Sequence, residues 1–105
     1  MNRNLNKKLD IEVELPLDDG GKILLLNSLS LALGQRAGNI CRLNSEQEMM
    51  WHAEISEGLS DEDYFTNIEF IGYGKSECLL GYRVSGFEVR LDVRDGRVLR
   101  EELVK

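Results

Sequence analysis

Strict alternation of apolar and charged residues is the feature of this sequence that most restricts its fold. Residues 87–93 read Phe-Glu-Val-Arg-Leu-Asp-Val, and residues 9–15 read Leu-Asp-Ile-Glu-Val-Glu-Leu. A period of two places every second side chain on the same face, so each segment predicts a strand with one apolar, buried face and one charged, solvated face. Ten glycines and a single proline also favour short strands joined by glycine turns over helices.

Turn residues divide the chain into hairpins. The Asp-Asp-Gly-Gly stretch at 18–21 and the Asp-Gly pair at 95–96 supply residues that tolerate positive φ. We therefore expect strands over residues 9–15, 22–27, 39–43, 49–55, 64–71, 77–84, 87–93 and 97–104. Leucines at 25, 26, 29 and 33 also fit a helical period, which leaves a helix over 23–33 as the alternative. The strong turn before this segment favours a strand followed by a loop over 28–38.

The length of 105 residues, with 42% hydrophobic and 30% charged residues, predicts one globular domain. Within it we expect a flexible polar tail over 1–8, a first β unit over 9–56, a polar connector over 57–63 and a second β unit over 64–105.

An internal repeat links the two expected units. A shift of 48 residues superposes residues 38–54 on 86–102 without a gap. The identities are Gly38 with Gly86, Arg42 with Arg90, Leu43 with Leu91, and Glu54 with Glu102. Repeats of about 40–50 residues are typical of the four-stranded blades of β-propellers.

The segment Leu91–Leu99, which reads LDVRDGRVL, is similar to the strand–turn–strand motif of quinoprotein-type propeller repeats. Leu43–Trp51 resembles a degenerate copy in which Gln47 stands where a glycine is common. The resemblance implies two four-stranded antiparallel units like propeller blades. Two blades cannot close a ring around a cofactor, so no cofactor is expected. The predicted fold is all-β, with the two units packed as a small sandwich.

Charge, cysteine content and hydropathy limit the classes of partner and the location that we expect for this chain. A net charge of −6 and a pI near 4.8 oppose nucleic-acid binding and favour a basic protein partner. Cys41 and Cys78 stand apart from any Cys/His cluster, so we expect reduced core cysteines and no metal site. The most apolar segment, residues 23–33, is shorter than a membrane span. We expect no membrane association and a cytoplasmic location.

No residue is predicted to be catalytic. His52 is the single histidine and is expected on the surface, without a nucleophile or a second acid in a cleft. The acidic stretch 61–63 lacks the residue spacing of a calcium loop, so we expect a solvated turn there.

The candidate interaction residues are two tyrosines and a row of carboxylates on the first strand: Tyr64, Tyr73, Asp10, Glu12 and Glu14. Exposed aromatic residues are common binding hot spots, and a carboxylate row suits a basic partner. The leading hypothesis is a non-catalytic protein-interaction module, immunity- or antidote-like in type. The alternatives are a structural protein that self-assembles through open sheet edges as a homodimer and, less favoured, a small-ligand-binding domain or enzyme.

Overall fold

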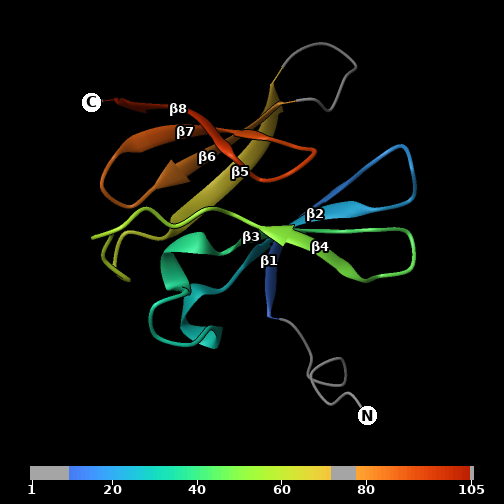
Figure 1. Cartoon of the computed structure of the whole chain (residues 1–105), viewed down its shortest axis with the longest axis horizontal. Coiled ribbons are helices and arrows are strands. Elements are labelled where there is room, and N and C mark those ends of the chain that lie inside the picture. Colours follow the sequence, from blue (N-terminus) through green and yellow to red (C-terminus); the bar gives the residue numbers. More distant parts are fainter. Residues whose placement is uncertain (1–9, 72–77, 105) are drawn as a thin grey trace.

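The computed structural model describes residues 10–71 and 78–104, which form two four-stranded antiparallel sheets (Figure 1). In each sheet the strands lie side by side in sequence order, joined as a meander. The first sheet holds β1 (Ile11–Pro16), β2 (Lys22–Leu26), β3 (Ile40–Leu43) and β4 (Met49–His52). The second holds β5 (Phe65–Ile71), β6 (Cys78–Arg83), β7 (Phe87–Asp92) and β8 (Val98–Leu103). The predicted all-β class and the two four-stranded units are confirmed.

The two sheets share one apolar core. Its buried members come from both sheets and from the segments that follow β4 and β7: Ile23, Leu25, Ile40, Ala53, Phe65, Ile68, Leu79, Val89, Leu91 and Val93. Most of them are the alternate residues of their strands, as a period of two requires. Burial of these faces against each other is the main favourable term in folding.

A second, smaller apolar cluster lies on the opposite face of the first sheet. It comprises Leu24, Leu26, Cys41 and Leu43, and Leu31 packs against it. The strand β2 is therefore buried on both faces, as its continuous apolar run predicts. Residues 28–38 form no α-helix: two short 3₁₀ turns, η2 (Ser28–Ser30) and η3 (Arg36–Gly38), lie within an extended loop.

Asn39 and Arg83, both buried, connect the sheets through polar contacts. The Asn39 amide donates to the carbonyls of Leu26 and Phe65 at 2.9 Å each, and its oxygen accepts from the Phe65 N–H at 2.8 Å. The Arg83 guanidinium lies 4.1 Å from the centroid of the Phe65 ring and donates to the Ala37 carbonyl. These bonds satisfy backbone groups that would otherwise be buried without partners.

Trp51 joins β4 to the turn between β7 and β8. Its indole N–H donates to the Val93 carbonyl at 2.9 Å. A Cβ on Gly96 would lie 2.7 Å from Cδ2 of the indole, and Gly96 has a φ of 78°. Glycine is therefore required at this turn for both space and backbone conformation.

Two predicted faces are wrong in detail because the strands contain β-bulges. Ile11 pairs with Leu26 although Val13 pairs with Leu25, so Ile11 leaves the core-facing row and is 43% exposed. A second register shift, next to Leu43, comes between Met49 and Trp51 on β4, so these two residues lie on opposite faces and Met49 is exposed, whereas a period of two would place both on one face.

The prediction of two core cysteines is half right. Cys41 is buried, whereas Cys78 is half-buried at the start of β6, and both thiols are free. Among the residues that the structure describes, no helix is long and apolar enough to cross a membrane.

Candidate functional site

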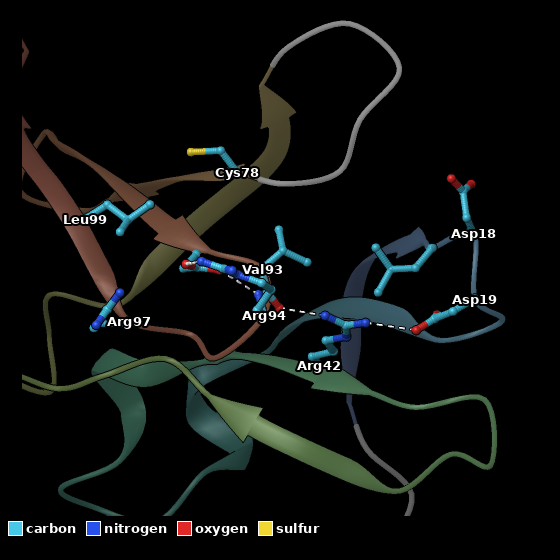
Figure 2. A pocket seen from close by; sticks show the side chains of 10 residues that line it. Asp18, Asp19, Arg42, Cys78, Val93, Arg94, Arg97 and Leu99 are labelled. Atoms are coloured by element: carbon cyan, nitrogen blue, oxygen red, sulfur yellow. Dashed lines mark hydrogen bonds and ion pairs between the residues drawn. The ribbon is translucent and has the colours of Figure 1, made fainter.

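A cleft of about 750 Å³ lies where the hairpin ends of the two sheets meet (Figure 2). Its charged lining residues are Asp18 and Asp19 from the turn after β1, Arg42 from β3, and Asp92, Arg94 and Arg97 from the end of β7 and the turn that follows. Leu17, Cys78, Val93 and Leu99 complete the lining. The cleft thus has equal numbers of guanidinium and carboxylate groups among its lining residues.

Arg42 spans the cleft between the sheets. It donates to the Asp19 carboxylate at 2.9 Å and to the Val93 carbonyl at 2.8 Å, as the dashed lines in Figure 2 mark. The pKa of Asp19 lies below its ordinary value because its carboxylate accepts a hydrogen bond from the Gly21 N–H and another from Arg42. The Nε of Arg42 is buried and has no hydrogen-bond partner among the described residues.

The negative charge of Asp92 is balanced by an arginine of the turn that follows it. The Arg94 guanidinium donates to both carboxylate oxygens, at 3.1 and 2.9 Å, and the Arg94 backbone N–H adds a bond of 2.8 Å. These contacts lower the pKa of Asp92 to about 2. Because Asp92 and Asp19 stay ionised at neutral pH, neither carboxyl group has a proton to donate as a general acid.

His52 and the metal-ligating residue types are the other candidates for chemistry that the sequence offered. His52 is exposed, and its ring Nδ1 contacts the carbonyl of the adjacent Ala53 at 3.2 Å. Over residues 10–71 and 78–104, no three His, Cys, Asp or Glu side chains are grouped to hold a metal ion.

The carboxylate row predicted on the first strand is exposed but interrupted. Asp10, Glu12 and Glu14 are all exposed to solvent. The β-bulge in β1 falls at Glu12, and Glu14 forms an ion pair with Lys22 at 3.2 Å. Asp10 lies next to the loop that follows β2, because its carbonyl accepts from the Asn27 N–H at 2.8 Å.

Of the two predicted tyrosines, Tyr64 lies within the described residues. Tyr64 is half-buried just before β5, and its carbonyl accepts a hydrogen bond from Val84. Tyr73 lies outside the described residues. Within the described chain, no hydrogen bond joins Tyr64 to the acidic residues of β1.

Sequence reasoning missed the most exposed apolar side chains that the structure describes. Leu29 and Leu33 are 73% and 75% exposed. They belong to the loop over residues 28–38, which we call the leucine loop. A signal was available: this segment is the most apolar in the sequence, and a loop laid over one sheet face cannot bury every leucine.

Hydrogen bonds hold the leucine loop in one conformation. At its start, the Asn27 side chain accepts from the Leu29 N–H at 2.9 Å. In its middle, Arg36 Nε donates to the Leu31 carbonyl at 3.0 Å. The Gly34 N–H donates to both oxygens of Asp61, at 3.0 and 2.9 Å. A loop fixed in this way loses little conformational entropy when its exposed side chains bind.

Two acidic residues adjoin the leucine loop in the chain's hydrogen-bond pattern. Asp61 is held against Gly34, the residue after Leu33, and Asp10 adjoins Asn27, the cap of the turn that contains Leu29. We call Leu29, Leu33, Asp10 and Asp61 together the leucine-loop surface. It combines two exposed leucines with two acidic residues.

No family model, no curated protein and no solved structure matches this chain. The resemblance of residues 43–51 and 91–99 to propeller repeats therefore stays a prediction.

Proposed function

We propose that this chain is a non-catalytic protein-interaction module that binds its partner through the leucine-loop surface. The observation that carries the proposal is that Leu29 and Leu33, each about three-quarters exposed, stand on a loop held by hydrogen bonds. Full burial of a leucine side chain contributes about 1.5–3 kcal/mol. Two such anchors would supply much of the binding free energy of a micromolar complex.

The acidic residues of the leucine-loop surface indicate which charge the partner's surface should carry. Asp10 and Asp61 are bonded to residues of the loop or of its start, and the whole chain carries a net charge of −6. The complementary surface is an apolar pocket bordered by Lys and Arg. Charges at the rim mainly steer association, so binding should weaken as salt screens them.

A basic enzyme that the chain masks fits this chemistry, and we therefore propose an immunity- or antidote-like role. We also propose a cytoplasmic location, because free thiols at Cys41 and Cys78 are typical of a reducing compartment. Co-expression with a candidate toxin tests the antidote role. The wild-type chain should restore growth, and L29S/L33S should not.

Quantitative affinity capture tests the contact site. Wild-type chain, L29S/L33S and the matched control V84S, which alters an exposed valine far along the sequence, are immobilised and exposed to lysate of the source cell. We expect a basic protein that is retained by the wild type and V84S but not by L29S/L33S. Its affinity is then measured with purified components, where the double variant should bind roughly 100-fold more weakly. An unchanged set of retained proteins for L29S/L33S would refute the proposal.

A second candidate function, self-assembly through an open sheet edge, is favoured by the exposure of β8 and is developed below. The small-ligand or enzyme alternative has less support, because the carboxylates Asp19 and Asp92 in the cleft are already paired with arginines of the same chain.

A further inference from the structure

The strand β8 is an open edge of the second sheet. It pairs with β7 on one side, is the last strand in the sheet order, and lies at the outer margin of the molecule in Figure 1. Every residue from Leu99 to Leu103 is exposed. Edge strands are templates for pairing with another chain unless something protects them.

The other three edges carry such protection. The edge strand β1 has a bulge at Glu12 and ends at Pro16. The edge strand β4 is only four residues long. The edge strand β5 lies against β1 and β2 of the other sheet. Bulges, prolines, short strands and coverage all discourage pairing. The strand β8 also has a bulge, at Leu99, but it contains no proline, is six residues long and has no strand on its outer side in the described chain.

The hydrogen-bond pattern of β8 identifies the backbone groups that remain free. The Val104 N–H donates to the Gly86 carbonyl at 3.0 Å, next to the opposed pair Phe87 and Leu103. This makes Phe87 and Leu103 a non-hydrogen-bonded pair. Because the pattern alternates along an antiparallel ladder, the N–H and C=O of Glu101 and Leu103 point away from β7.

Two charges on β8 are poorly matched within the monomer. Arg100 lies opposite Arg90, and Glu102 lies opposite Glu88. Like charges directly opposite each other in a sheet are destabilising. Their nearest opposite charge is each other, along the strand, at 3.7 Å in an exposed pair that contributes little.

Residues 98–104 read Val-Leu-Arg-Glu-Glu-Leu-Val, and from either end the order is valine, leucine and then a charged residue. The two halves differ only in the sign of that charge, because Arg100 is basic and Glu102 is acidic. The centre of this segment is Glu101. In an antiparallel pairing of two such strands, that reversal becomes a complementarity, because a cation on one copy meets an anion on the other.

We propose that two copies of this chain pair through antiparallel β8 strands about a two-fold axis at Glu101. The opposed pair in this register is Arg100 with Glu102, from one subunit to the other. At the bulge of β8, Leu99 and Val98 come near Leu103 and Val104 of the other copy. The free backbone groups of Glu101 bond to those of Glu101 of the partner subunit. The two second sheets thereby become one continuous sheet, as an isologous interface requires.

Side chains select this register over its neighbours. If the register is shifted so that Arg100 of one copy lies opposite Arg100 of the other, Leu99 lies opposite Glu101. A shift in the other direction places Glu102 of one copy opposite Glu102 of the other. Only the register centred on Glu101 aligns apolar residues with apolar residues and gives two opposite-charge pairs. Its single like-charge contact is Glu101 against Glu101 of the partner subunit.

Charge reversal tests the register without threatening the fold. R100E and E102R each remove a like-charge contact with β7 inside the monomer, so both variants should fold at least as well as the wild type. Each one alone creates two like-charge pairs across the two-fold axis. We expect the dimer dissociation constant to rise roughly tenfold or more in either variant. In an equimolar mixture, R100E and E102R should form a heterodimer as tight as the wild-type dimer.

Sedimentation velocity from micromolar to roughly millimolar protein measures these constants. E101Q removes the central repulsion and should tighten the dimer several-fold. The matched control L29S/L33S leaves β8 untouched and should dimerise like the wild type, which separates this inference from the proposed partner surface. A wild-type chain that stays monomeric over the whole range, or a mixture of R100E and E102R that fails to associate, would overturn the proposal.

Discussion

Replacing Asn39 by alanine probes the contact that joins the two sheets. Asn39 is 1% exposed, and its side chain makes three hydrogen bonds to backbone groups at the ends of β2 and β5. Alanine removes all three while changing little of the apolar packing. The carbonyl of Leu26 and both the N–H and the C=O of Phe65 then lose this partner in a buried environment.

The expected loss of stability is several kcal/mol. A typical hydrogen bond contributes about 1 kcal/mol net, and a buried group left without a partner costs about 1–3 kcal/mol. We therefore expect Asn39→Ala to lower the free energy of unfolding by about 3–5 kcal/mol. A domain of this size has about 5–10 kcal/mol in total, so the variant should be close to unfolding at 37 °C.

Urea unfolding followed by Trp51 fluorescence measures the effect. The midpoint should fall while the slope with denaturant stays constant, since the exposed surface on unfolding is unchanged. The matched control is Asn67→Ala, which removes an exposed asparagine of β5, two residues after Phe65, and should change stability by less than about 0.5 kcal/mol. A loss below about 1 kcal/mol for Asn39→Ala would refute the view that this side chain joins the sheets.

Three further predictions follow. The pKa of Asp92 is about 2 in the folded chain and about 3.9 when unfolded, so its stabilising contribution is complete above about pH 4 and is lost as pH falls toward 2. In acid unfolding, the stability of Asp92→Asn should therefore fall less between pH 4 and pH 2 than that of the wild type. Gly96→Ala should lower stability by about 2–4 kcal/mol in urea unfolding, because alanine disfavours the positive φ at this position and its Cβ would overlap the ring of Trp51. Burial raises the pKa of Cys41 to about 11, so a thiol reagent at pH 8 should label Cys78 much faster than Cys41, and equal rates would contradict the observed burial.

Alternation predicted the strands well where one face is buried and no bulge intervenes. Val89 and Leu91 of β7 are fully buried, as their period of two requires. It failed at Ile11 and Met49, because a bulge inserts one residue and moves the side chains beyond it to the other face. Nothing in the local pattern marks a bulge, since it depends on how the neighbouring strand pairs.

The surfaces were harder to predict than the strands. Leu29 and Leu33 belong to an apolar run, and whether a leucine in a loop is buried depends on the sheet beneath it. The cleft beside Arg42 and Asp19 requires two turns about 75 residues apart to meet, which no local motif encodes. By contrast, the symmetric order of residues around Glu101 is present in the sequence. It predicts pairing between two copies only when β8 is known to be an edge strand.

By itself, the sequence determined the all-β class, the division into two four-stranded units and most core residues, because period-two patterning and glycine turns act over a few residues. Tertiary structure alone decided which strands lie at an edge, where bulges redirect side chains, and how Asn39 joins the sheets. These features arise from contacts between segments distant in the chain, and such contacts depend on how whole sheets pack.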